Sequence, residues 1–157
     1  RLTKLTNFKG DFRNGKSIHT AIKQAKEYLN DGYIHIIQID LDSFFDTINH
    51  DRMMSELFKT IKDKQLLRLI RLYLQSETLQ NGKSLGKRYC GLIQGGNLSP
   101  LLANIYLNSL DWELSRLGVR FIRYADDITV CCNSEQSAMA IKAIIIRFIE
   151  QKLLLIK

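Results

Sequence analysis

The sequence predicts an α+β fold in which an antiparallel sheet carries helices on one face. Three segments with the apolar patterns of strands lie at 33–41, 119–125 and 127–132. Segments with apolar residues at helical spacing separate and follow them, and a last strand is expected to begin near Leu153. Apart from a helical and hairpin insertion, this is the β-α-β-β-α-β order of a ferredoxin-like sheet.

Length and composition indicate one globular domain. The 157 residues are 45% hydrophobic and 25% charged, enough for one core, and no Pro/Gly/Ser-rich linker divides them. The apolar runs near the C-terminus are interrupted by Arg147, Glu150 and Lys152, so no membrane span is expected. The chain starts without methionine and stops inside a predicted element, so we expect it to be a fragment of a longer protein.

The charge distribution indicates the class of binding partner, and the cysteines indicate the redox compartment. The net charge is +7, and residues 1–30 hold seven Lys/Arg against two Asp/Glu. A basic end favours a polyanion such as nucleic acid, although a solvated basic face explains the charge equally well. Cys90, Cys131 and Cys132 lack the spacing of a zinc site or a disulfide framework, which predicts buried thiols in a reducing compartment.

The first half of the chain contains a helix, a strand and two further helices. Apolar residues at helical spacing predict a helix over 17–31. The segment 33–41 is apolar on both alternating faces, which is typical of a central strand covered on both sides, and it runs directly into Asp40. Two amphipathic helices are expected at 49–61 and 63–75.

The second half begins with a hairpin and contains two more helices. Asn81-Gly82 is a hairpin turn signal. Ser99 as N-cap and Pro100 at the first helical position predict the start of a helix that stops at Gly118. After the two strands, a last helix is expected over about 135–152.

Three aspartates stand where strands should be apolar. Asp40 ends the first strand, and Asp126 and Asp127 separate the other two. Each alone is explained as a strand-end cap or a hairpin tip. In a β-α-β-β sheet, however, these places can lie side by side. Carboxylates at such short distances from one another need cations between them. Oxygen ligands suit Mg²⁺, and two such ions about 4 Å apart serve phosphoryl displacement. The outline is that of a nucleotidyl-transfer site.

Three segments resemble successive reverse transcriptase motifs, in the right order. They are "DLDSFFDTINHD" at 40–51, "QGGNLSPLLANIYLNSLD" at 94–111, and "YADD" at 124–127 after "FIR". The likeness is closest to bacterial group II intron-encoded proteins, the intron maturases. In that class "GDFRNGKSIHTAI" at 10–22 resembles the segment before the first catalytic aspartate. Ile93, Asn97 and Asn14 depart from the usual pattern without removing a catalytic group.

The resemblance implies the palm of a right-hand polymerase with the helical part of the fingers and without a thumb. The chain would be a single partial reverse transcriptase domain over 1–157. Residues 1–32 would form a fingers segment, and 33–157 the palm with a fingers insertion at about 62–92.

The resemblance also assigns catalytic residues. Asp40 and Asp126 would be the principal ligands of two Mg²⁺ ions, with Mn²⁺ as a substitute, and the carbonyl of Leu41 would assist. Asp127 would complete the carboxylate set of an RNA-directed DNA polymerase.

Further residues are implied around the nucleotide and the primer. Phe45 matches the bulky residue that excludes a 2′-hydroxyl, and the alternative is a core aromatic beside Phe44. Gln94 with its two glycines matches the segment against the incoming nucleotide, and the alternative is a glycine turn before the helix. The nucleotide set is Ser43, Phe44, Phe45, Gln94 and Gly95, and the primer and template set is Tyr124, Ala125, Gly96, Arg13 and Lys16.

Three functions follow from this sequence. The first is an RNA-directed DNA polymerase in the bacterial cytoplasm, with RNA template, intron RNA, DNA primer and dNTP as partners and no membrane. The second is an RNA-binding splicing cofactor whose polymerase is incidental or lost. The third is a ferredoxin-like domain with a regulatory or structural role. A truncated domain could also self-associate through exposed apolar surface.

Overall fold

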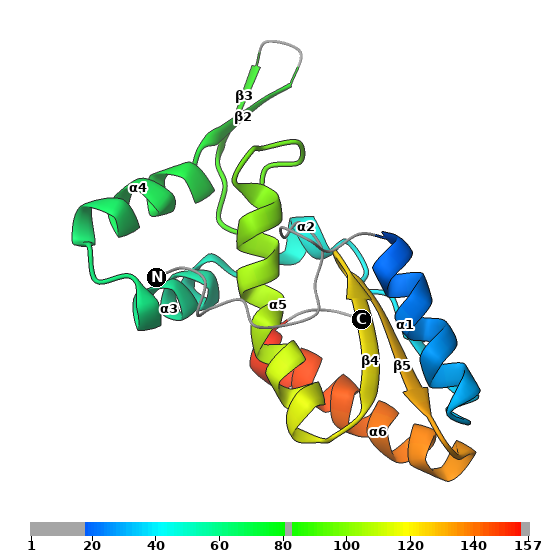
Figure 1. Ribbon diagram of the computed structural model, residues 1–157. Coiled ribbons are helices and arrows are strands. Elements are labelled where there is room, and N and C mark those ends of the chain that lie inside the picture. The colour runs from blue at the N-terminus through cyan, green and yellow to red at the C-terminus, as the bar shows by residue number, and fades with distance from the viewer. Residues whose placement is uncertain (1–17, 81–82, 155–157) are drawn as a thin grey trace.

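The computed structural model describes residues 18–80 and 83–154 and confirms a mixed fold of helices and antiparallel strands (Figure 1). Its elements are α1 (Ile18–Asn30), β1 (His35–Ile39), α2 (Phe44–Thr47), α3 (His50–Thr60), α4 (Lys64–Leu74), β2 (Glu77–Gln80), β3 (Lys83–Lys87), α5 (Ser99–Arg116), β4 (Arg120–Tyr124), β5 (Asp127–Cys132), α6 (Glu135–Phe148) and the π-helix η2 (Ile149–Leu153).

The main sheet has three antiparallel strands in the order β1-β5-β4. The prediction that 33–41 is a central strand is therefore wrong for the described residues, because β5 is central and β1 lies at an edge. Ile37 is buried against the core, whereas Ile36 on the opposite face is 50% exposed. The expected last strand does not begin at Leu153, which instead ends η2.

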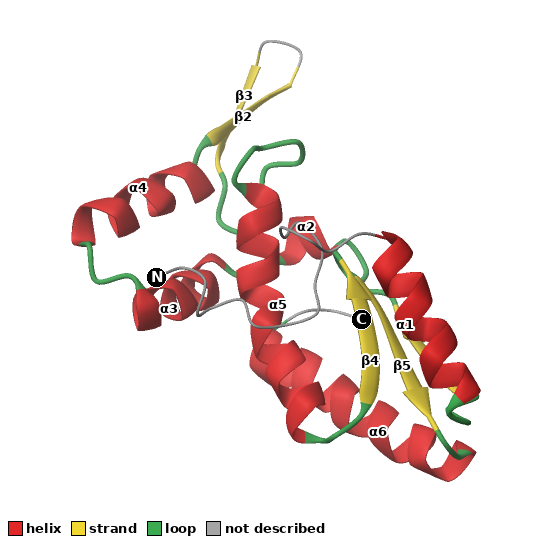
Figure 2. Ribbon diagram, viewed as in Figure 1, coloured by secondary structure: helices red, strands yellow, loops and turns green. Residues whose placement is uncertain are grey.

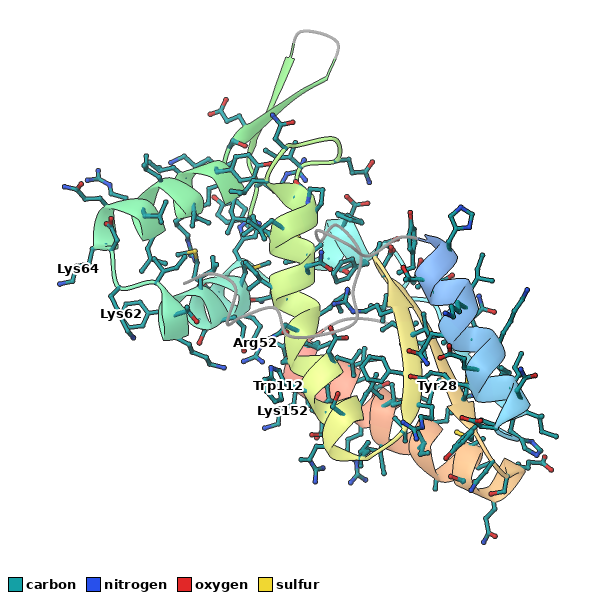
Figure 3. The ribbon with its side chains drawn as sticks, viewed as in Figure 1. Tyr28, Arg52, Lys62, Lys64, Trp112 and Lys152 are labelled. Atoms are coloured by element: carbon teal, nitrogen blue, oxygen red, sulfur yellow. The ribbon has the colours of Figure 1, made fainter. Side chains whose placement is uncertain are left out.

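Helices cover both faces of this sheet, not the single face that was predicted (Figure 2). Helices α5 and α6 pack on the face that carries Ile37. Helix α1, which carries the buried Tyr28 (Figure 3), packs on the other face. The guanidinium of Arg120 lies 5.7 Å from the ring centroid of Tyr28. Residues alternate between the faces of a strand, so Arg120 faces α1 while its neighbour Phe121 faces the core.

Helix α5 passes through the centre of the core. Its residues from Leu102 to Leu107 are all buried, as expected where a helix is surrounded by other elements, whereas Leu101 and Trp112 on the same helix are exposed. It begins at Ser99 with Leu98 as N-cap, so the predicted cap is one residue off. The hydroxyl of Ser99 instead donates to the carbonyl of Ile93 (2.6 Å). The predicted stop at Gly118 is confirmed, and Gly118 adopts φ 67°.

The two predicted amphipathic helices are confirmed as α3 and α4, and a separate two-stranded sheet follows them. Asn49 accepts from the amide of Arg52 at the start of α3, and Asp63 accepts from the amide of Gln65 at the start of α4. Helix α4 and the β2–β3 hairpin extend away from the three-stranded sheet (Figure 1). The expected turn at 81–82 lies outside the described residues.

The prediction that the cysteines are buried is confirmed for two residues and wrong for the third. Cys131 and Cys132 are buried on the central strand, whereas Cys90 is exposed in the connection before α5. Among the described residues, no helix combines the length and apolarity that crossing a membrane requires.

Candidate active site

The β4–β5 hairpin turns at Ala125 and Asp126. Tyr124 pairs with Asp127 as the last pair of the ladder, which leaves two residues for the turn. The sequence placed the turn at Asp126-Asp127, one residue too late, because Asp127 is already the first residue of β5. Ala125 adopts φ 53°, a left-handed conformation that L residues other than Asn and Asp rarely adopt.

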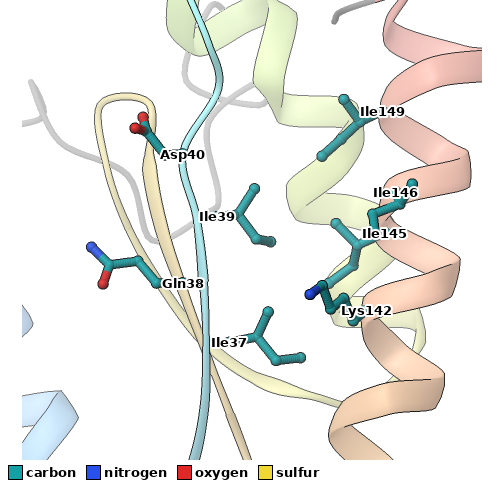
Figure 4. A pocket seen from close by; sticks show the side chains of 8 residues that line it. All are labelled: Ile37, Gln38, Ile39, Asp40, Lys142, Ile145, Ile146 and Ile149. Atoms are coloured by element: carbon teal, nitrogen blue, oxygen red, sulfur yellow. The ribbon is translucent and has the colours of Figure 1, made fainter. Parts of the chain in front are cut away.

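Asp40 lies at the same end of the sheet as this turn. Ile39, the last residue of β1, pairs with Ile128, so the next step along both strands brings Asp40 opposite Asp127. Figure 4 shows the side chains of Asp40 and Gln38 on one side of β1, and those of the isoleucines on the other side, facing α6. Asp40, and Asp127 opposite it, therefore belong to the sheet face away from α6.

The strand ends that carry the three aspartates meet at one end of the sheet, but the side chains do not form a metal cage. Asp40 and Asp127 are exposed and Asp126 is half-buried. Within residues 18–80 and 83–154, no group of three or more His, Cys, Asp or Glu side chains is arranged to hold a metal ion. The expectation of a converged trio thus holds for the strand ends and not for the side chains as they stand.

The donor set nevertheless fits Mg²⁺. All donors are oxygens, and no ion pair within the described part of the chain uses one of the three carboxylates. The carbonyl of Leu41 accepts from the amide of Phe44 (3.2 Å) and keeps a second lone pair. An exposed, oxygen-only site of this kind suits an ion that retains water and binds substrate phosphate.

The segment after Asp40 places Phe44 and Phe45 in different environments. Ser43 adopts φ 48° and precedes the short helix α2. Phe44 is 2% exposed and packs on Tyr106, so it is a core residue, and its place in the expected nucleotide set stays a prediction. Phe45 is half-buried, with its ring centroid 5.3 Å from that of Phe44.

Phe45 faces the glycine-rich segment that was implied to hold the nucleotide. A pocket of about 410 Å³ is lined by Phe45, Gly95, Gly96, Asn97, Ser99 and Pro100. The side-chain amide of Gln94 lies 3.4 Å from the carboxylate of Asp46, one residue after Phe45. The structure therefore brings these two segments together, although some 50 residues separate them in the sequence.

Backbone contacts fix the approach of these segments. The amide of Leu92 donates to the carbonyl of Phe45 (2.6 Å). A Cβ on Gly91 would lie 2.8 Å from the carbonyl oxygen of Asp46, and Gly91 adopts φ 82°. Only glycine fits this crossing without a backbone shift.

Gly96 is enclosed by a contact from α4. A Cβ there would lie 2.1 Å from the hydroxyl of Tyr73 and 2.9 Å from that of Ser99. The two hydroxyls lie 3.1 Å apart. Tyr73, which the sequence did not single out, therefore supports the Gln94–Gly96 segment from the helical insertion.

His50 of α3 contacts the segment that precedes Gln94. Its Nε2 donates to the carbonyl of Gly91 (2.7 Å), and its Nδ1 has no partner among the described residues. Burial lowers the pKa of this imidazole below its ordinary value, and the hydrogen bond to Gly91 opposes the shift.

A buried polar network holds the turn from inside the core. Arg123 is bidentate to Asp111, with Nε to Oδ1 at 2.8 Å and Nη2 to Oδ2 at 2.6 Å, and both side chains are 0% exposed. Nη1 of Arg123 donates to Oδ1 of Asn104 (2.8 Å) and to the carbonyl of Ala125 (2.9 Å).

Sequence reasoning missed this network, although its signal was present. Arg123 occupies an inward-facing position of β4, two residues after buried Phe121. Asn104 and Asp111 are seven residues apart on α5, which places them on one side of a helix that is otherwise largely apolar.

The primer and template residues are placed only in part. Tyr124 is exposed beside the turn, and Ala125 forms it. Arg13 and Lys16 lie outside the described residues, so their contact with template or nucleotide stays a prediction.

Carboxylates at the end of β1 and at the β4–β5 turn, beside the pocket at Phe45 and Gly95, define the palm of a polymerase with part of its fingers. The sequence model "Reverse transcriptase (RNA-dependent DNA polymerase)" matches residues 3–157. The chain belongs to the reverse transcriptase family.

Two curated proteins are similar to much of this chain. Group II intron-encoded protein LtrA of Lactococcus lactis subsp. cremoris is 38% identical over 112 residues, 71% of this chain and 18% of that protein. Protein YkfC of Escherichia coli (strain K12) is 35% identical over 107 residues, 66% of this chain and 28% of that protein. The chain thus spans less than a third of the length of either relative, and the likeness to intron-encoded proteins is confirmed.

Two solved structures share the fold. Apo telomerase from Candida tropicalis, truncated from the C-terminal domain, has a TM-score of 0.66 at 13% identity, over 92% of this chain and 34% of that chain. Telomerase from Candida albicans, in complex with a fragment of telomeric RNA, has a TM-score of 0.68 at 12% identity, over 87% and 29%. At such identities the likeness concerns the fold alone.

Proposed function

We propose that the chain is the fingers–palm part of an RNA-directed DNA polymerase that adds deoxynucleotides to a primer 3′-hydroxyl on an RNA template. The observation that carries this proposal is the register that brings Asp40 to the sheet end occupied by Asp126 and Asp127. An exposed set of acceptor-only side chains at one place suits cations and the phosphates they bind.

In this proposal Asp40 and Asp126 are the principal metal ligands, the carbonyl of Leu41 assists, and Asp127 completes the set. Two Mg²⁺ ions, or Mn²⁺ in their place, would supply Lewis-acid stabilisation of developing negative charge when bound there. The hairpin presents Asp126 and Asp127, and β1 delivers Asp40 from a rigid strand. Rigid delivery matters because much of the barrier reduction in such reactions comes from positioning.

The pocket between Phe45 and the Gly95–Gly96 backbone is proposed to receive the incoming deoxynucleotide. Phe45 supplies a flat, half-buried aromatic wall against which a sugar can pack. The backbone at Gly95 and Gly96 can approach the nucleotide closely because it carries no side chains. Tyr124 and Ala125 lie next to the aspartates, where the primer terminus would reach the site.

The domain division expected from the sequence also remains a proposal. Residues 1–32 would belong to the fingers, and the segment at about 62–92 would be a fingers insertion in the palm. Support comes from α4 and the β2–β3 hairpin, which stand apart from the three-stranded sheet (Figure 1). Intron RNA, a DNA primer and the bacterial cytoplasm are proposed from the likeness to LtrA.

A primer-extension assay tests the proposal. The full-length protein is given an RNA template, a DNA primer, dNTPs and Mg²⁺. Asp126→Ala should reduce extension about a thousandfold, since loss of a metal ligand removes several kcal/mol of stabilisation. Asp31→Ala, which removes an exposed aspartate in the turn after α1, serves as the matched control. Wild-type extension by Asp126→Ala would refute the proposal.

A splicing cofactor is the second candidate, favoured by the intron-encoded name of LtrA. The same two variants separate the candidates when RNA splicing is measured beside extension. A protein that supports splicing but never extends a primer would be a cofactor only. Splicing that survives Asp126→Ala while extension is lost would show that both functions coexist.

A further inference from the structure

Arg123 connects the core helix α5 to the turn that carries the proposed metal ligands. Two of its nitrogens bind Asp111, and the third binds both Asn104 and the carbonyl of Ala125. Neither Arg123 nor Asp111 exposes any part of its side chain. The turn is thus tied to the core helix α5 and not only to its own strands.

We propose that Arg123 is a positioning residue that sets the conformation of the Ala125–Asp126 turn and thereby orients Asp126 and Asp127. This inference rests on the proposed function, because it assigns to Arg123 the task of aiming the ligands of that site.

The covalent geometry of the turn explains how one hydrogen bond can do this. The carbonyl oxygen of Ala125 and the amide of Asp126 belong to one planar peptide unit. Holding the oxygen therefore limits rotation of the plane that leads into Asp126. The same bond stabilises Ala125 at φ 53°, a conformation that L residues rarely adopt without support.

The chemistry of the side chain explains why an arginine is found here. A guanidinium has five N–H donors in a rigid plane, enough to bind a carboxylate with two nitrogens and a carbonyl with the third. An ammonium group lacks this fixed fork. Lysine at this position could pair with Asp111 but could not hold the carbonyl of Ala125 in the same geometry.

The charge of Arg123 is already compensated by Asp111, so Arg123 does not serve as a counter-ion for Asp126 or Asp127. The bidentate pair with Asp111 balances the charge of Arg123 inside the core. Arg123 therefore acts on the turn through the geometry of its hydrogen bond. The carboxylates of Asp126 and Asp127 are left without an ion pair among the described residues, and they remain available to metal.

Two variants remove the contact to Ala125 without leaving an unpaired buried charge. Arg123→Met combined with Asp111→Leu replaces the ion pair by apolar groups, an exchange that other proteins tolerate. Arg123→Lys keeps a charge for Asp111. Arg116→Met is the matched control, because Arg116 lies on α5, the helix that carries Asp111, but forms its ion pair with Glu113 at the surface.

The test measures Mn²⁺ binding by electron paramagnetic resonance on the full-length protein with primer and template, together with thermal melting and steady-state kinetics. Both Arg123 variants should melt near the wild type, bind Mn²⁺ at least tenfold more weakly, and lose at least tenfold in kcat with little change in the KM for dNTP. Arg116→Met should match the wild type in all three measurements.

Two results would overturn the proposal. One is a folded Arg123 variant that binds Mn²⁺ as tightly as the wild type. The other is failure of both variants to fold, which would assign the network to stability. If the wild type bound Mn²⁺ but extended no primer, the proposed polymerase would be refuted, while Mn²⁺ binding by the variants would still decide the role of Arg123.

Discussion

Single residues in this chain differ in role from neighbours of the same type. Phe44 and Phe45 are adjacent aromatics, yet the first is sealed under Tyr106 and the second lines the pocket with Gly95. The difference follows from α2, which turns one ring to the core and the next toward solvent. Sequence reasoning could not separate the two without the resemblance to reverse transcriptases.

Shortening Phe45 should relax sugar discrimination. Phe45→Val removes the wall that a 2′-hydroxyl would meet, so the preference for dNTP over rNTP should fall roughly tenfold or more. The ratio of kcat/KM values for the two nucleotides measures this preference. Phe58→Val, which changes an exposed phenylalanine of α3, should leave the ratio unchanged. An unchanged ratio in Phe45→Val would show that the ring does not gate the sugar.

His50 should make stability depend on pH. Burial lowers its pKa in the folded state below the ordinary 6.5, so the unfolded state binds the proton more readily. The neutral form contributes full stability above pH 6.5, and this contribution is lost as the pH falls toward the lowered pKa. Each unit by which the pKa is lowered corresponds to about 1.4 kcal/mol in the free energy of unfolding.

Denaturant unfolding of the wild type and of His50→Gln between pH 7.5 and 5 tests this expectation. Glutamine can still donate to the carbonyl of Gly91 but does not titrate. The variant should therefore lose less stability on acidification than the wild type. Parallel losses in both proteins would show that His50 is not the responsible group.

At the scale of elements, the pocket depends on the contact between α4 and the segment before α5. Gly96→Ala should push the hydroxyl of Tyr73 away and shift this segment, raising the KM for dNTP about tenfold or more. Tyr73→Phe alone keeps the ring and should have a small effect. Combined with Gly96→Ala, Tyr73→Phe should bring the raised KM for dNTP part of the way back to the wild-type value, because the clashing oxygen is gone. Failure of this rescue would mean that the contact does not set the pocket.

Elements with strong local signals were predicted well, and elements defined by distant partners were not. Asn49 and Asp63 start α3 and α4 near the expected residues because capping is local. The edge position of β1 could not be read from its sequence, since an isoleucine-rich strand has the same pattern at an edge or in the centre. The turn at Ala125 could not be read from its sequence either, because its carbonyl accepts from Arg123, whose other partners lie on α5.

At the scale of the whole molecule, the site is assembled from segments far apart in the chain. Asp40 and the Asp126–Asp127 pair are predictable as candidates because aspartate is unusual at strand ends that are otherwise apolar. Their meeting at one end of the sheet follows from the antiparallel register. The buried support from Arg123 and Asp111 was not predicted, because side-chain pairing across a core depends on packing that one sequence does not display.

The central claim is that Asp40 and Asp126 act as one site, and a double-mutant cycle tests it most directly. Asp40→Asn, Asp126→Asn and the double variant of the full-length protein are compared in single-nucleotide addition on an RNA template with Mg²⁺. When two residues act as a unit, the effects of substituting them are strongly non-additive. We expect each single variant to lose nearly as much rate as the double variant. Losses that multiply, or an Asp40→Asn protein with wild-type rate, would contradict it.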